Sequence, residues 1–204
     1  MKLFWSSRSP YVRKVMVVAH ERGLAGRIAC ERTIVAATSP NAVVMAHNPL
    51  AKLPTLLLDD GSALYDSPVI CEYLDSLAGA PFLHPPAGPA RFTALRRQAL
   101  ADGVLDLLLG RLGERGRTDE RAAQLEAGAK EKLAAVLAAL ESEAPSLEAA
   151  PLDIGGIAIG CALSYWDFRF ASEPWRAGCP RLAAWHAAFS ARPSVTATAH
   201  EDVY

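Results

Sequence analysis

The chain has 204 residues, enough for one large domain or two small ones. Hydrophobic residues make up 51% of it and the formal net charge is -1, so we expect a sizeable core and find no basic excess for nucleic acid. The longest apolar stretches fall well short of the ~20 residues of a membrane span, and no signal-peptide apolar region follows the first residues. We therefore expect a cytoplasmic protein with no nucleic-acid or membrane partner.

The four cysteines are far apart in the sequence, and no C-x-x-C pair occurs among them. Neither a zinc site nor a dithiol redox motif is indicated, and the five histidines are scattered as well. Reduced cysteines that act as small core residues are the simpler interpretation. We expect no metal ion.

The first half of the chain alternates short strands with helices. Residues 2–5 read as a strand, and Ser9-Pro10 is a helix start whose helix would end near Gly23. Residues 27–34 follow as a second strand, and residues 36–48 show only weak turn and helix signals.

The stretch from residue 50 to residue 77 predicts a hairpin that leads into a helix. Residues 55–58 form a short apolar run, residues 59–61 a turn, and residues 63–65 the returning strand. Ser67 would be the N-cap of the helix and Pro68 its first residue. The resulting β-α-β, β-β-α order predicts one α/β unit with about four strands.

Asp66 and Ser67 would stand at the mouth of that helix, where unpaired N–H groups and the macrodipole favour an anion. Ser67 could donate to a carboxylate, while Asp66 could accept from an ammonium. Together they suit the amino-acid end of a ligand. The simpler alternative, favoured by these residues alone, is that Ser67 only caps the helix and Asp66 only forms a turn.

The second half of the chain is predicted to be all-helical. Residues 79–89 are rich in proline and glycine and read as a linker. Four helices follow: residues 91–112, a helix capped by Thr118 and ended by Pro145, one capped by Asp153, and one from Pro180 to Pro193. The predicted domains are therefore residues 1–78 and 90–204, joined by the linker 79–89.

Several short motifs, taken in their order along the chain, resemble those of the glutathione S-transferase family, in particular its serine-type bacterial and tau-like members. They are Ser9-Pro10-Tyr11-Val12-Arg13, Asn48-Pro49 with Lys52-Leu53-Pro54-Thr55, Tyr65-Asp66-Ser67-Pro68, and the later Asp153 to Gly160 segment. The resemblance covers essentially the whole chain. It implies a thioredoxin-like N-terminal domain followed by a helical bundle, with glutathione as co-substrate.

The resemblance implies how glutathione is held. Asp66 and Ser67 would bind its γ-glutamyl end. Leu53, before a cis Pro54, would pair its backbone N–H and C=O with the peptide, as a neighbouring strand does. Lys52 would reach the glycyl carboxylate, or is simply a solvated loop lysine.

Ser9 is the predicted catalytic residue. A hydroxyl at a helix N-terminus that donates to the glutathione sulfur favours the thiolate, which is the nucleophile. Ser6 and Ser7 are rival donors, and simple capping is the alternative role of Ser9. Because position 9 is not a cysteine, the mixed-disulfide chemistry of cysteine-type members is disfavoured.

The helical domain would contribute to a homodimer and to the electrophile pocket. Asp102, or its competitor Asp106, would reach the glutathione amine of the partner subunit, unless both only face solvent. Candidate walls of the electrophile pocket are Tyr11, Leu108, Leu109, Tyr165, Trp166 and Arg169.

The predicted function is glutathione transfer to small hydrophobic electrophiles, which a peroxidase side activity could accompany. The alternative is a non-catalytic glutathione-binding or protein-interaction module of the same fold. One departure from the family pattern is Gly156, which stands where an acidic residue would complete a capping box with Asp153.

Overall fold

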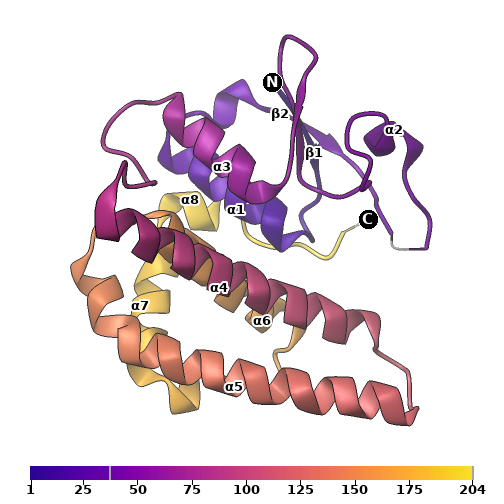
Figure 1. Ribbon diagram of the computed structural model, residues 1–204, viewed down its shortest axis with the longest axis vertical. Helices are drawn as coiled ribbons and strands as arrows, with labels where there is room; N and C mark the ends of the chain where they lie inside the picture. The colour runs from indigo at the N-terminus through magenta and orange to yellow at the C-terminus, as the bar shows by residue number, and fades with distance from the viewer. Residues whose placement is uncertain (37, 204) are drawn as a thin grey trace. The chain divides into compact units, whose positions relative to one another are not determined.

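Short apolar segments near the N-terminus form a four-stranded sheet in the order β2-β1-β3-β4 (Figure 1). Its strands are β1 (Lys2–Trp5), β2 (Ala29–Arg32), β3 (Thr55–Leu57) and β4 (Ala63–Leu64). β1 pairs parallel with β2 and antiparallel with β3, and β4 is antiparallel to β3. This computed structural model describes residues 1–36 and 38–203.

Two helices, α1 (Pro10–Glu21) and α3 (Ser67–Ser76), pack against each other beside this sheet (Figure 1). The short segments η1 (Ala25–Arg27) and α2 (Ala42–Met45) complete the α/β unit. Its core consists of fully buried side chains from strands and helices, among them Leu3, Phe4, Val15, Leu56, Ile70 and Leu74. The predicted strand and helix order is confirmed.

The strand register brings three separate segments to one edge of the sheet. Phe4 lies opposite Thr55, so the carboxyl end of β1 meets the amino end of β3. Leu56 lies opposite Leu64, so the carboxyl end of β4 meets the same end of β3. The loop to α1, the segment before β3 and the start of α3 therefore all leave the sheet at this edge.

The helical unit spans Ala87–Arg192. It contains α4 (Gly88–Gly113), α5 (Glu120–Ala149), α6 (Ile154–Arg169), η2 (Arg176–Gly178) and α7 (Pro180–Ser190). α6 is its central element: twelve of its sixteen residues are buried, and it packs on α4 and α7. The predicted helical second half is confirmed. Among the described residues, every helix is too short or too polar to span a membrane.

The last segment of the chain groups with the α/β unit, which comprises Met1–Pro86 and Pro193–Tyr204. It begins with the short helix α8 (Pro193–Thr196), which the sequence analysis did not predict. Arg13 Nη2 donates to the Val195 carbonyl at 3.2 Å, and Arg8 pairs with Asp202 at 2.9 Å. The expected domain of residues 90–204 therefore ends earlier in the structure, because the segment from Pro193 onward groups with the α/β unit. Residue 204 lies outside the described residues.

Several predicted helix ends shift. α4 begins at Gly88, inside the expected linker, and Asp119 caps α5 in place of Thr118 by accepting from Ala122 N. Pro145 lies inside α5 and does not end it. The buried faces of Ala144 and Leu147 continue across Pro145, so packing outweighs the lost hydrogen bond.

The N-cap of α3 is also one residue earlier than predicted. Asp66 occupies the cap position and Ser67 is the first helical residue. The predicted cap of α6 is confirmed, since the Asp153 carboxylate accepts from Gly156 N at 2.8 Å. Gly156 therefore donates its backbone N–H to the cap, although it has no side chain to return the bond.

One buried carboxylate, Asp75 near the end of α3, fastens the segment that leaves the α/β unit. It accepts from the backbone N–H groups of Leu83 (3.0 Å) and His84 (2.7 Å), and His84 Nδ1 lies 3.0 Å away. Arg22, after α1, pairs with it at 3.1 Å. The Asp75 and His84 side chains are 2% and 4% exposed, so water screens little of this charge.

We predict that Asp75→Ala lowers the free energy of unfolding by about 3–5 kcal/mol, because Arg22 and two backbone N–H groups lose a buried partner. The measurement is the urea midpoint. The control is Asp59→Ala. The Asp59 carboxylate pairs with the terminal amine at 2.8 Å but is 89% exposed, so its loss should cost little. Equal shifts for the two variants would contradict the prediction.

Candidate functional site

Ser9 precedes α1 at the sheet edge described above. Its Oγ accepts a hydrogen bond from Val12 N at 3.3 Å, which makes it the N-cap of the helix. Pro10 at the first helical position fixes the helix start. In this bond the hydroxyl acts only as an acceptor, so its proton stays available for a ligand.

The rival serines differ in their hydrogen bonding. Ser7 Oγ donates to the Glu201 carbonyl at 3.0 Å, so its proton is already engaged by the C-terminal segment. Ser6 Oγ accepts from Arg8 N at 3.3 Å and keeps its proton. Ser7 therefore differs from Ser6 and Ser9 in that its hydroxyl proton is already used. The sequence alone could not show this difference.

A polar brace shapes the loop before β3. Asn48 is 1% exposed, and its Nδ2 donates to Thr55 Oγ1 at 2.9 Å while its Oδ1 accepts from Leu50 N at 3.1 Å. Thr55 Oγ1 in turn donates to the Lys52 carbonyl at 2.8 Å. The brace closes the loop from residue 48 to residue 55 on itself.

This loop presents Leu53 with open backbone groups. The Leu53–Pro54 peptide bond is cis, as the resemblance implied. Leu53 is 9% exposed, and within residues 1–36 and 38–203 neither its N–H nor its C=O has a hydrogen-bond partner. Such groups fit an extended peptide ligand. Lys52 beside it is exposed.

The start of α3 offers a second set of open groups. Asp66 is exposed and its carboxylate makes no cap bond to the helix. Ser67 is 2% exposed, and no described residue hydrogen-bonds its hydroxyl. The helix N-terminus adds the favourable end of its dipole. An acceptor for an ammonium thus stands next to donors for a carboxylate.

The remaining predicted site residues belong to the helical unit, apart from Tyr11 on α1. Leu108, Tyr165 and Trp166 are at most 6% exposed, and Trp166 Nε1 donates to the Glu173 carbonyl. These side chains serve the packing of the described helices. Those with more exposure are Leu109, Arg169 and Asp102, while Asp106 is exposed.

Two of the thiols, those of Cys30 and Cys179, are less acidic than usual. Burial raises the pKa of the Cys30 thiol, and burial followed by the charge of Glu141 raises that of Cys179. A higher pKa means less thiolate at neutral pH. Within residues 1–36 and 38–203, His, Cys, Asp and Glu form no group that could hold a metal ion.

Comparison with known proteins decides the family. Residues 8–77 match the model of the glutathione S-transferase N-terminal domain. An uncharacterized GST-like protein of Escherichia coli, YibF, is 32% identical over 186 residues, which cover 89% of this chain and 90% of that protein. The chain belongs to the glutathione S-transferase family.

Solved structures of glutathione S-transferases share the fold. One from Pseudomonas fluorescens Pf-5, with bound glutathione, is 41% identical with a TM-score of 0.93 over 98% of both chains. One from Methylobacillus flagellatus, also with glutathione bound, is 36% identical with a TM-score of 0.84 and covers 98% of this chain and 99% of its own. The predicted family and fold class are confirmed.

We predict that Asn48→Ala destabilises the protein by about 1–3 kcal/mol, because Thr55 and Leu50 lose a buried partner. The Leu50 amide should exchange with solvent faster in the variant. Hydrogen exchange measured by NMR checks this. The matched control, Asn41→Ala, removes the cap of α2 and should leave the Leu50 amide unchanged. An unchanged Leu50 rate in both variants would rule out the brace.

Proposed function

We propose that this chain binds glutathione, activates its thiol and transfers it to small hydrophobic electrophiles. The main support is the meeting, at one sheet edge, of the Ser9 hydroxyl, the open backbone groups of Leu53 and the start of α3. Three relatives or structures point the same way: the two structures above hold glutathione, and a second Pseudomonas fluorescens structure holds S-(propanoic acid)-glutathione.

In this proposal each part of glutathione has a partner. Asp66 accepts from the γ-glutamyl ammonium, and the Ser67 hydroxyl and N–H donate to its carboxylate. The Leu53 N–H and C=O pair with the peptide backbone, and Lys52 reaches the glycyl carboxylate. Since these contacts need no electrophile, they set the affinity for glutathione.

Ser9 would supply the chemistry. Its hydroxyl donates to the glutathione sulfur, and the N-terminus of α1 adds a favourable dipole, so the thiolate forms at lower pH. The thiol proton passes to water, and the thiolate attacks the electrophilic carbon. Either a leaving group then departs with the bonding electron pair, or an activated double bond takes the sulfur at one carbon and a proton from water at the other. Ser7 is the weaker candidate because its proton is engaged by Glu201.

A peroxidase side activity and a cytoplasmic location belong to the same proposal. The location fits glutathione, the thiol that keeps cytosolic cysteines reduced, and the side activity would use the same activated thiolate on a peroxide. Activity with an organic hydroperoxide would test the first. Tight glutathione binding without turnover on any aryl chloride, activated alkene or hydroperoxide would favour the non-catalytic module instead.

We predict that Ser9→Ala raises the pKa of the bound thiol by roughly one to two units, because a hydrogen bond to a charged group is worth about 1.5–3 kcal/mol. Turnover of an activated aryl chloride at neutral pH should fall about ten- to a hundredfold, and the rising limb of its pH profile should move to higher pH. Glutathione affinity should change less.

Two matched variants accompany this experiment. Ser6→Ala and Ser7→Ala should leave the pH profile in place, and Ser7→Ala should only release Glu201. Ser9→Ala should also cost about 1 kcal/mol of stability through the lost cap. If its pH profile superimposes on the wild type while stability falls, Ser9 is a cap only.

We also propose a homodimer in which Asp102, on α4, reaches the glutathione amine of the partner subunit. Sedimentation should then give twice the mass of the chain at micromolar concentration. Asp102→Asn should weaken glutathione binding about tenfold, and Asp106→Asn, one turn later, should not. A monomer, or a larger effect at Asp106, would contradict this proposal.

A further inference from the structure

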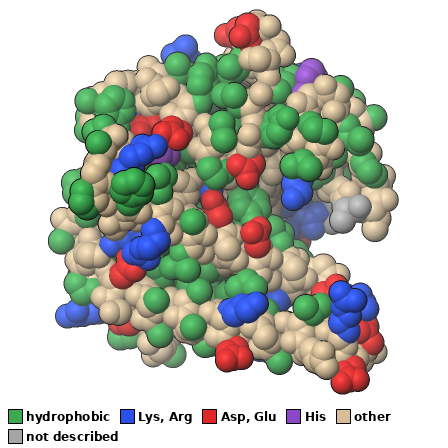
Figure 2. Space-filling view, in the orientation of Figure 1, with side chains coloured by type: hydrophobic (Ala, Val, Ile, Leu, Met, Phe, Trp, Pro, Cys, Tyr) green, Lys and Arg blue, Asp and Glu red, His purple; other side chains and the backbone are tan. Residues whose placement is uncertain are grey.

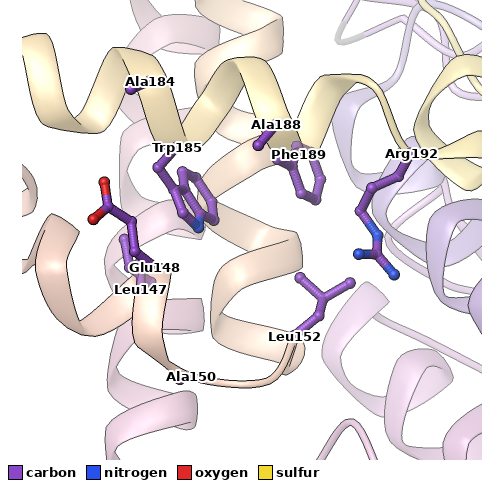
Figure 3. Close-up of a pocket in the computed structure, with 9 residues that line it drawn as sticks. All are labelled: Leu147, Glu148, Ala150, Leu152, Ala184, Trp185, Ala188, Phe189 and Arg192. Carbon is purple, nitrogen blue, oxygen red and sulfur yellow. The ribbon is translucent and has the colours of Figure 1, made fainter.

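The helical unit contains a cavity that none of the proposed glutathione or electrophile residues lines. It lies between the end of α5, the segment that follows it and one face of α7 (Figure 3), with a volume of about 380 Å³. This volume is in the range of small-molecule pockets, ~300–1,000 Å³. The side chains that give it character are Glu148, Leu152, Trp185, Phe189 and Arg192.

An aromatic pair on α7 forms one wall of this cavity. Trp185 and Phe189 are one turn apart, and their rings stack with centroids 5.6 Å apart and planes 17° apart. Phe189 is 4% exposed, whereas Trp185 is only half-buried. The Trp185 indole therefore faces the cavity as a flat, partly exposed surface, and the buried Phe189 ring packs against it.

Two glycines of α6 face this pair, and one of them makes room for Phe189. A Cβ atom at Gly160 would lie 2.2 Å from the Phe189 ring, and one at Gly156 would lie 3.7 Å from Trp185 Cζ2. Gly156 and Gly160 are one turn apart, like the two aromatic residues above them. The Phe189 ring thus lies against bare helix backbone and has little freedom to move, so the Trp185 indole has a preorganised neighbour.

The cavity is charged at its ends and apolar between them. Figure 3 shows Glu148 beside Trp185, on the side away from Phe189 and Arg192. The Glu148 carboxylate is exposed, and no described residue pairs with it. An acidic end and an aromatic and aliphatic middle with Leu152 define an orientation for a ligand.

We propose that this cavity binds a small arylalkylammonium ion. Its ring lies against Leu152 and the adjacent edge of Trp185, and its ammonium lies over the open indole face and pairs with Glu148. The indole face attracts the same cation, because the π-system is electron-rich there. The proposal does not depend on glutathione chemistry.

Calorimetry with three indoles of similar shape tests the charge preference. The probes are tryptamine, a cation at neutral pH, the uncharged tryptophol, and the anion indolepropionate. Tryptamine should bind about five- to tenfold more tightly than tryptophol, the sum of one partly exposed ion pair and one cation–π contact. Indolepropionate should bind more weakly than either.

Three variants locate the binding. Glu148→Gln should bring tryptamine to the affinity of tryptophol, while Glu131→Gln, an exposed carboxylate on the same helix, should change nothing. Trp185→Leu should weaken tryptamine and tryptophol alike. Because Glu148 is a surface residue, its variant is expected to fold, and this keeps the test decisive even if Trp185→Leu does not.

Saturating glutathione separates this cavity from the proposed active site. Tryptamine affinity should be the same with and without glutathione. Loss of tryptamine binding in glutathione, equal affinities for all three probes, tightest binding of indolepropionate, or an unchanged affinity in Glu148→Gln would each overturn the proposal. None of these outcomes bears on whether glutathione is transferred.

Discussion

The buried carboxylate of Asp75 is the constraint on which the α/β unit depends most. Three segments distant in sequence converge on it: Arg22 after α1, α3 itself, and the backbone at Leu83 and His84. Arg22 also donates to the carbonyls of Gly79 and Pro81. A single charge thus fixes the far ends of both helices whose starts carry the proposed chemistry.

The starts of α1 and α3 have the opposite character, because they leave hydrogen-bonding groups open. Ser9 accepts from its helix but keeps its proton, and Asp66 stands in the cap position without capping. Leu53, between them along the sheet edge, leaves its own N–H and C=O unpaired within the described chain. Open groups held by a closed frame are what recognition of a peptide such as glutathione requires.

Local signals predicted much of this arrangement, because the helix starts are written in adjacent residues. Ser9-Pro10 and Ser67-Pro68 mark α1 and α3, the latter to within one residue. Long-range pairings could not be predicted: nothing near Asp75 in the sequence indicates Arg22, and nothing near Ser7 indicates Glu201. Pro145 misled for the same reason, since only tertiary packing carries α5 past it.

In this molecule the distribution of surface charge indicates less about ligand selection than the positions of individual side chains do. On the face shown in Figure 2, acidic and basic side chains are interspersed, in keeping with the formal net charge of -1. On this face no large region of a single charge is present to attract a ligand at long range. Selection has to come from groups at fixed places, such as Ser9 before α1 and Glu148 beside Trp185. Both stand on helix ends or faces that packing holds rigid, so each is testable by a single substitution that leaves the core intact.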